Sequence, residues 1–238
     1  HGRIDPATLA RSLGQHYDMH RGYGPAMHEL LPRLAFGEDW QTSAQRLFYG
    51  QGTFGNGAAA RVAPVGAYFF DDPDLCIEEA RRSAAVTHAH AEAHAGAIAV
   101  ALAASYSTRR RRIGPGAVPE GSALLEALVA GIPDGAVRRG LATAVEIPRT
   151  MPIGEVAARL GNGDRVSCPD TVPLVCWVAA HWIDDFVEAL WTTALAFGDL
   201  DTNAAIVGGI VACSVGQQGL PSEWLANREP LPTWHLAS

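Results

Sequence analysis

The sequence predicts an all-α fold, a compact multi-helix bundle in one domain. Apolar residues recur at the three- and four-residue spacing of helices, whereas period-two alternation bounded by turn residues is hard to find. The composition agrees, because 48% of the 238 residues are hydrophobic and 18% are charged, as expected for a chain that buries a sizeable core. This length fits one generous domain, so we expect a single domain over residues 1–238.

The first helix is predicted by an Asp-Pro pair. Asp5 is placed as an N-cap and Pro6 as the first helical residue, after which Leu9, Leu13 and Tyr17 fall on one face. An Asp170-Thr171 cap is expected at the start of a later apolar helix. The same patterns predict further helices from Asp72-Pro73 onward and over residues 88–108, 119–131, 134–147, 171–196 and 203–215.

Small residues on the last of these helices indicate close packing. Ala204, Gly208 and Ala212 lie on one face at four-residue spacing, with Ala205 and Gly209 beside them. Glycine costs about 1 kcal/mol relative to alanine inside a helix. We therefore expect another helix to approach this face closely.

Charge and cysteine usage exclude several classes of protein. The net charge is −7 and the one basic run, Arg109–Arg112, is placed in a solvated loop, which argues against a nucleic-acid partner and a polybasic membrane patch. The longest apolar stretches, 95–104 and 204–213, are about half of a membrane span. No signal peptide is evident, and we expect a cytoplasmic protein.

The cysteines form no CxxC pair and are expected to be reduced: Cys76, Cys168, Cys176 and Cys213.

The stretch GDLDT, residues 198–202, sets two carboxylates at the start of an apolar helix with no cation beside them. One interpretation is helix capping, with Asp201 or Thr202 accepting a backbone N–H and the other acid facing the positive end of the helix dipole. The other is a hard-metal site, because Asp199, Asp201 and Thr202 supply oxygen ligands within one turn. A further acidic pair from elsewhere would complete a two-metal arrangement.

A glycine-rich loop, QGTFGNGAAARVAP, covers residues 51–64. Gly52, Gly55 and Gly57 surround Asn56 just before an alanine-rich segment that resembles a helix, an arrangement that aims backbone N–H groups at a phosphate. The loop is neither a Walker A motif nor a dinucleotide-binding GxGxxG. A Gly-Asn turn without a ligand remains the alternative.

Three histidines gather in THAHAEAHAGA, residues 87–97. Their spacing is not that of the zinc-protease motif, because Glu92 lies midway between His90 and His94 and faces away from both. His90 and His94 are expected on the helix surface. His88, beside the expected cap Thr87, is better placed to meet a ligand. The stretch 160–182 is interpreted as core architecture.

Taken in order, these motifs resemble the ADP-ribosylglycohydrolase family, which includes ADP-ribosylarginine hydrolases and the dinitrogenase-reductase-activating glycohydrolase. The resemblance rests on FGNGAAARVAP, VTHAHAEAHAGAIAVA, GNGD with DTVPLVCWVA, and AFGDLDTNAAIVGGIVA followed by LPSEW. It extends from the GNG segment to about Trp224. Phe197 and Leu200 replace residues of the family's Gly-Gly-Asp-Thr-Asp-Thr pattern, whereas the ligand positions are intact.

The resemblance implies an all-α hydrolase that holds two Mg²⁺ ions and cleaves the bond between ADP-ribose and an acceptor. Its substrates would be an ADP-ribosylated protein or small molecule, and ADP-ribose itself would bind. By position, Asp199 and Asp201 would be catalytic and, with Thr202, metal ligands. The residues implied to contact ADP-ribose are Gly52, Thr53, Phe54, Gly55, Asn56, Gly57 and His88.

Half of the implied metal site is not found in the sequence. The family carries a Thr-Asp-Asp cluster before an early helix, whereas the Asp-Asp pairs here are Asp71-Asp72 and Asp184-Asp185, both elsewhere. We therefore expect an N-terminally incomplete domain whose general base lies outside this sequence. Two alternatives stay open: an ADP-ribose-binding or structural protein without catalysis, and a zinc hydrolase using His88, His90 and His94.

Overall fold

A computed structural model describes residues 2–230 and confirms the all-α prediction. Fourteen α-helices and two short 3-10 turns account for its regular structure, and among the described residues β-structure is limited to one isolated bridge. The helices are α1 Pro6–Gln15, α2 Pro25–Ala35, α3 Trp40–Gly50, α4 Gly57–Ala60, α5 Ala63–Tyr68, α6 Pro73–Ala85, α7 Ala91–Ile113, α8 Gly121–Gly131, α9 Ala136–Val145, α10 Ile153–Leu160, α11 Cys168–His181, α12 Phe186–Leu195, α13 Leu200–Val215 and α14 Ser222–Asn227.

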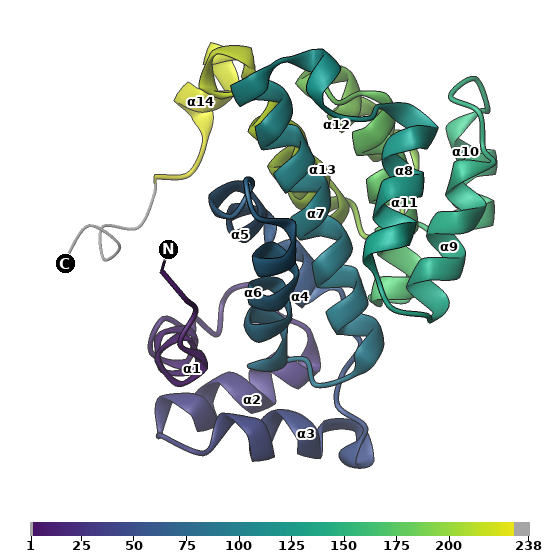
Figure 1. Ribbon diagram of the computed structural model, residues 1–238. Coiled ribbons are helices and arrows are strands. Elements are labelled where there is room, and N and C mark those ends of the chain that lie inside the picture. Colours follow the sequence, from purple (N-terminus) through teal and green to yellow (C-terminus); the bar gives the residue numbers. More distant parts are fainter. Residues whose placement is uncertain (1, 231–238) are drawn as a thin grey trace.

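Helix α7 is the centre of the bundle. Figure 1 shows it passing through the middle of the molecule, with α5 and α6 on one side, α8 and α11 on the other and α13 behind it in this view; all five pack against it. Most of its side chains from Ala93 to Ser105 are buried, and many are alanines. Alanine lets neighbouring helices approach closely on all sides. A second, smaller core joins α1, α2 and α3 to Val86 at one end of the molecule.

The predicted helix starts at Asp5 and Asp72 are confirmed. Each aspartate accepts the backbone N–H of the residue three positions later, with donor–acceptor distances of 2.7 Å to Thr8 and 3.0 Å to Leu75. The expected close approach to α13 is found at Gly209, where a built Cβ would lie 3.1 Å from the Ala63 Cβ of α5. At Gly208 a built Cβ would make only ordinary contacts, at 3.6 Å, with Leu190 and Phe186 of α12.

The expected continuous helix over residues 171–196 is wrong. Helix α11 ends at His181, and α12 begins at Phe186 behind Asp185, whose carboxylate accepts the N–H of Glu188 at 3.0 Å. The expected Asp170-Thr171 cap is also wrong, because Ser167 is the N-cap residue and α11 begins three residues earlier than predicted. The Asp170 carboxylate instead accepts the N–H of Arg165 at 2.9 Å.

The arginine run Arg109–Arg112 does not lie in a solvated loop. It forms the last turns of α7, and Arg110 is only 7% exposed. Its guanidinium pairs with the carboxylates of Glu120 and Asp184. These carboxylates compensate the cost of burying the charge. Of the described residues, no helix is both long and apolar enough to cross a bilayer.

We expect Gly66→Ala to destabilise the protein by about 1–3 kcal/mol, as overpacking does. A Cβ at Gly66 would lie 2.8 Å from the carbonyl carbon of Ala101, so α5 would have to move away from α7. Urea unfolding measures the change. Gly154→Ala in α10 is the matched control, because nothing lies within 4 Å of its built Cβ; it should be neutral or stabilise by up to about 1 kcal/mol. Equal effects would contradict the close packing of α5 on α7.

Candidate active site

The acidic turn before α13 depends on left-handed backbone. Phe197 and Gly198 have φ of 57° and 77°. A Cβ at Gly198 would lie 2.8 Å from the Asn162 side-chain nitrogen, so only glycine fits. The Asp199 N–H then donates to the Asn162 carbonyl at 3.1 Å. Non-glycine residues at positive φ are strained and often mark functional sites.

The capping interpretation, in which Asp201 or Thr202 accepts a backbone N–H, is supported at Asp201, whereas Asp199 makes a different contact. Asp199 occupies the N-cap position of α13, yet its side chain makes no cap hydrogen bond. Its carboxylate accepts a hydrogen bond from the Asn56 side-chain amide at 2.8 Å instead. Asp201 accepts the N–H of Thr202 at 3.0 Å, so a backbone contact is present on the second acid only.

The two carboxylates of the turn are close to each other and lack a cation. A hydrogen bond with the Asp199 carboxyl, followed by the Thr202 N–H, lowers the pKa of Asp201 below its ordinary value. Within residues 2–230, neither acid forms an ion pair with arginine or histidine. Two adjacent acids without a compensating charge are a favourable place for a cation from solution.

The glycine-rich loop is fixed against the start of α11. Gly55 pairs with Ser167 through an isolated antiparallel bridge, and the Cys168 N–H donates to the Phe54 carbonyl at 2.9 Å. The Thr53 hydroxyl accepts the Gly55 N–H at 3.1 Å. As predicted, a helix follows the loop, although α4 is only four residues long. The Phe54 ring is 44% exposed and lies 5.1 Å from the His90 ring, between centroids.

Asn56 connects the loop to the acidic turn. Its buried amide nitrogen donates to the Thr171 hydroxyl at 3.0 Å and to the Asp199 carboxylate at 2.8 Å. An amide group has two N–H donors, so both are used. Residues separated by more than a hundred positions are therefore joined by one side chain. The structure thus brings the predicted Asn56 and Asp199 together.

His88 lies directly beneath the loop. It is 3% exposed, and a Cβ built on Gly55 or Gly57 would lie 3.5 Å or 3.3 Å from its imidazole ring. Its Nδ1 is 2.7 Å from the Thr87 hydroxyl. Burial first, then Arg61 and His94, lower the pKa of His88 to about 3. The ring is therefore neutral at physiological pH.

The histidine segment is arranged differently from expectation. Thr87 caps no helix; α7 begins at Ala91, and His90 is the N-cap residue whose Nδ1 accepts the Glu92 N–H at 3.1 Å. His90 and His94 are partly buried rather than on the surface. Glu92 does face away, accepting N–H groups from Ala136 and Val137 at the start of α9.

The histidine segment and the acidic turn offer different donor atoms to a metal. Among the described residues, no three of the histidine, cysteine, aspartate and glutamate side chains gather as a metal-binding group. The three histidines therefore form no zinc site of the usual three or four ligands. Asp199, Asp201 and Thr202 offer only oxygen atoms, which fits Mg²⁺ because this ion keeps several waters and takes one or two protein carboxylates.

Sequence reasoning missed three side chains of this region. Thr171 and Asn203 belong to the hydrogen-bond network around Asn56 and Asp199. The side-chain amide oxygen of Asn203, Oδ1, is buried without a hydrogen-bond partner in the described structure. The GNGD stretch at 161–164, interpreted as core architecture, supplies the Asn162 carbonyl that accepts from both Asp199 and Asn203. The third is Phe48, exposed and strained at φ 50°. The Asn162-Gly163 turn in the GNGD stretch is a sequence signal that could have pointed to this part of the site.

The structure is an all-α domain in which a glycine-rich loop, a buried histidine and an acidic turn lie together. This is the arrangement that the resemblance in the sequence implies. A family model described as ADP-ribosylglycohydrolase matches residues 1–237. The chain belongs to the ADP-ribosylglycohydrolase family.

The proteins similar to the chain include curated relatives and solved structures. ADP-ribosylhydrolase ARH3 of Xenopus tropicalis is 40% identical over 74 residues, 30% of this chain and 21% of that protein. The protein of the same name from Mus musculus is 26% identical over 249 residues, 93% of this chain and 66% of its own length. A solved "ADP-ribosylglycohydrolase-related protein complex" is 25% identical, with a TM-score of 0.54, over 93% of this chain and 73% of that one. The chain thus spans about two thirds of the length of the mouse relative.

We expect the stability of the protein to fall as the pH drops from 6.5 towards 3. The folded pKa of His88 is about 3, against 6.5 without burial, so in this window the unfolded chain binds a proton that the folded chain does not. His88 alone would cost on the order of 2 kcal/mol between pH 7 and pH 5.

Urea unfolding of His88→Gln over the same pH range measures this contribution. The variant should lose stability less steeply than the unsubstituted protein. His20→Gln, at an exposed histidine, is the matched control and should keep the original slope. Identical slopes in all three proteins would show that His88 is not a buried neutral ring.

Proposed function

We propose that the protein hydrolyses the bond between ADP-ribose and an acceptor, and so removes ADP-ribosylation. The observation that carries the proposal is the Asn56 amide, which joins the glycine loop to the Asp199 carboxylate at 2.8 Å. A loop suited to phosphate and an acidic turn suited to a cation are thereby held in one site. Family membership and the ARH3 relatives support the same reaction.

The loop would bind the diphosphate. Helix α4 begins without a side-chain cap, so N–H groups at its start remain available to an anion. Neutral His88 fixes the loop from below without adding a charge. The exposed rings of Phe54 and Phe48 would cover a planar or ribose portion of the ligand.

The acidic turn would hold Mg²⁺ through Asp199, Asp201 and Thr202. When bound, this metal would draw charge from ribose hydroxyls and order a water for attack on the anomeric carbon. Asn56 holds the Asp199 carboxylate in place, and the Asn162 carbonyl holds its backbone. Groups that hydrogen-bond to a metal ligand raise metal affinity and activity largely by fixing the orientation of that ligand.

A second candidate is ADP-ribose binding without turnover. It is favoured by the number of acids, because the described residues bring only Asp199 and Asp201 together at the turn and contain no three-ligand group. Release of ADP-ribose from an ADP-ribosylated peptide, with and without Mg²⁺, distinguishes the two. Mg²⁺-dependent release supports hydrolysis, whereas saturable ADP-ribose binding without release supports the binding role. If the protein neither binds ADP-ribose nor releases it from the peptide, both candidates are refuted.

We also propose a reducing, cytoplasmic location. Four cysteines are free thiols, of which Cys76, Cys168 and Cys176 are buried. Burial raises the pKa of Cys76 and Cys176 to about 12, which makes them poor nucleophiles. Such thiols are typical of proteins from reducing compartments.

A further inference from the structure

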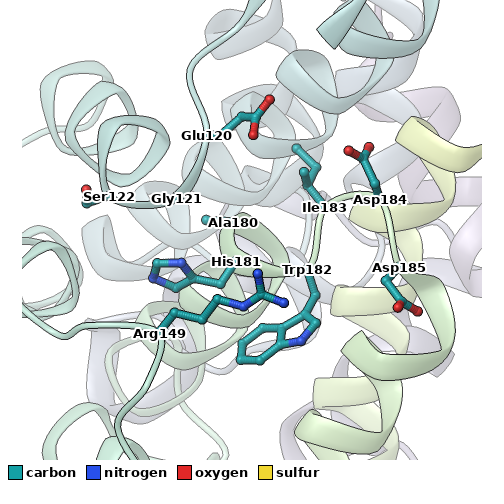
Figure 2. A pocket seen from close by; sticks show the side chains of 10 residues that line it. All are labelled: Glu120, Gly121, Ser122, Arg149, Ala180, His181, Trp182, Ile183, Asp184 and Asp185. Carbon is teal, nitrogen blue, oxygen red and sulfur yellow. The ribbon is translucent and has the colours of Figure 1, made fainter.

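A cavity of about 470 Å³ lies at the far end of α11 from the candidate active site. Its lining comes from the start of α8, the loop after α9 and the α11–α12 connection, and Figure 2 shows these side chains. The 14 residues of α11 correspond to about 21 Å of helix, so the cavity is distinct from the glycine loop at the helix start. Its volume is within the range of small-molecule sites.

The acidic side chains of this cavity already have partners. Glu120 and Asp184 both pair with the Arg110 guanidinium, and Asp184 also accepts the Ser214 hydroxyl at 3.0 Å. Asp185 accepts the Glu188 N–H at the start of α12. The Arg110 guanidinium therefore offsets part of the negative charge of the acidic wall, although Glu120 and Asp184 stay more than half exposed.

The opposite wall carries a cation without an acidic partner. The Arg149 guanidinium lies 4.9 Å from the centroid of the Trp182 ring, and no ion pair to Arg149 occurs among the described residues. Figure 2 shows its side chain reaching between His181 and Trp182. Stacking on the indole holds the guanidinium in place. Its N–H groups remain available to an oxyanion.

His181 adds a second polar group beside Arg149. Its Nε2 is buried and has no hydrogen-bond partner in the described structure. The ring is held against Trp177, with centroids 4.8 Å apart, and against Gly121, whose built Cβ would lie 3.5 Å from Nδ1. A buried polar atom without a partner is costly. An acceptor from a ligand would remove that cost.

The start of α8 completes the wall. The helix begins at Gly121 without a side-chain cap, because the Glu120 carboxylate is turned to Arg110. Its first N–H groups, together with the positive end of the helix dipole, favour a negative charge. Two independent elements, Arg149 and the start of α8, therefore present positive or donor groups to the same cavity, and the His181 ring lines it beside them.

We infer that this cavity binds a small oxyanion, a carboxylate or a phosphate group of a small molecule. Arg149 supplies the charge and the start of α8 adds backbone donors, with the imidazole of His181 lying beside them. The inference does not depend on the proposed hydrolase function, because the two sites share no residue.

Calorimetric titration of the purified protein with inorganic phosphate, glycerol 3-phosphate and succinate tests the inference. We expect saturable binding of at least one probe, and the probe that binds identifies the phosphate or carboxylate class. Arg149→Gln should weaken that binding roughly ten-fold or more, as expected for loss of a charge-assisted hydrogen bond. Arg139→Gln, an equal change of charge on the exposed face of α9, is the matched control and should leave it unchanged.

The imidazole proton resonances of His181, assigned by their loss in His181→Gln, locate the bound anion. They should shift as the site saturates. No saturable binding by any probe would overturn the inference. Equal weakening in both arginine variants, or saturation without a change at His181, would overturn it as well.

Discussion

Asp199→Asn is expected to abolish Mg²⁺-dependent hydrolysis while leaving the helical fold intact. The substitution removes the charge that a metal requires and keeps an oxygen that can accept from Asn56, now at 2.8 Å from the carboxylate. Mutation of a group that only supports a metal ligand costs about 10–100-fold in metal affinity or activity, and loss of the ligand charge itself should cost more. Stability should not fall, because one of two adjacent carboxylates is neutralised.

Release of ADP-ribose from an ADP-ribosylated peptide, together with thermal unfolding, checks this prediction. Asp134→Asn is the matched control: its carboxylate is exposed, pairs with Arg138 and lies on the α8–α9 connection. The control should retain activity. Full activity in Asp199→Asn would refute the assignment of Asp199 to the reaction.

Trp177→Ala is expected to lower the free energy of unfolding by about 3–5 kcal/mol. The Trp177 side chain is fully buried, and its indole N–H donates to the Ile147 carbonyl at 3.0 Å. The substitution leaves a large cavity beside α11 and removes the indole N–H that the Ile147 carbonyl accepts. Few single substitutions on the surface have a comparable effect.

Urea unfolding measures the loss, and Trp191→Ala provides the control. Trp191 is 58% exposed on α12, so its replacement should change stability by less than about 0.5 kcal/mol. Similar losses in the two variants would contradict the placement of Trp177 in the core.

Local patterns predicted the helices well where caps and periodicity agreed. The starts at Asp5 and Asp72 were correct because proline and a capping acid act within one turn. The break between α11 and α12 was missed, although Asp185 was visible as a cap, because the apolar stretch on both sides resembled one helix. Arg110 was placed in a solvated loop because one of its two acidic partners, Asp184, lies 74 positions away in the sequence.

The candidate site was predicted in its parts and not in its connections. The loop, His88 and the acidic turn were recognised from their residues. Their assembly depends on Asn56 reaching Thr171 and Asp199, 115 and 143 positions away. No local pattern specifies such contacts. The same limitation explains why Asn203 was missed. The start of α7 was placed too early for a different reason: its cap is local, but it is His90, and histidine is not among the residues that commonly cap helices.

Calorimetry of ADP-ribose binding, with and without millimolar Mg²⁺, tests most directly whether the glycine loop and the acidic turn form one site. Binding sites that share a network are coupled, and the coupling is reciprocal. We predict that Mg²⁺ tightens ADP-ribose binding in the unsubstituted protein and has no effect in Asp199→Asn. Equal affinity with and without Mg²⁺ in the unsubstituted protein would contradict the account.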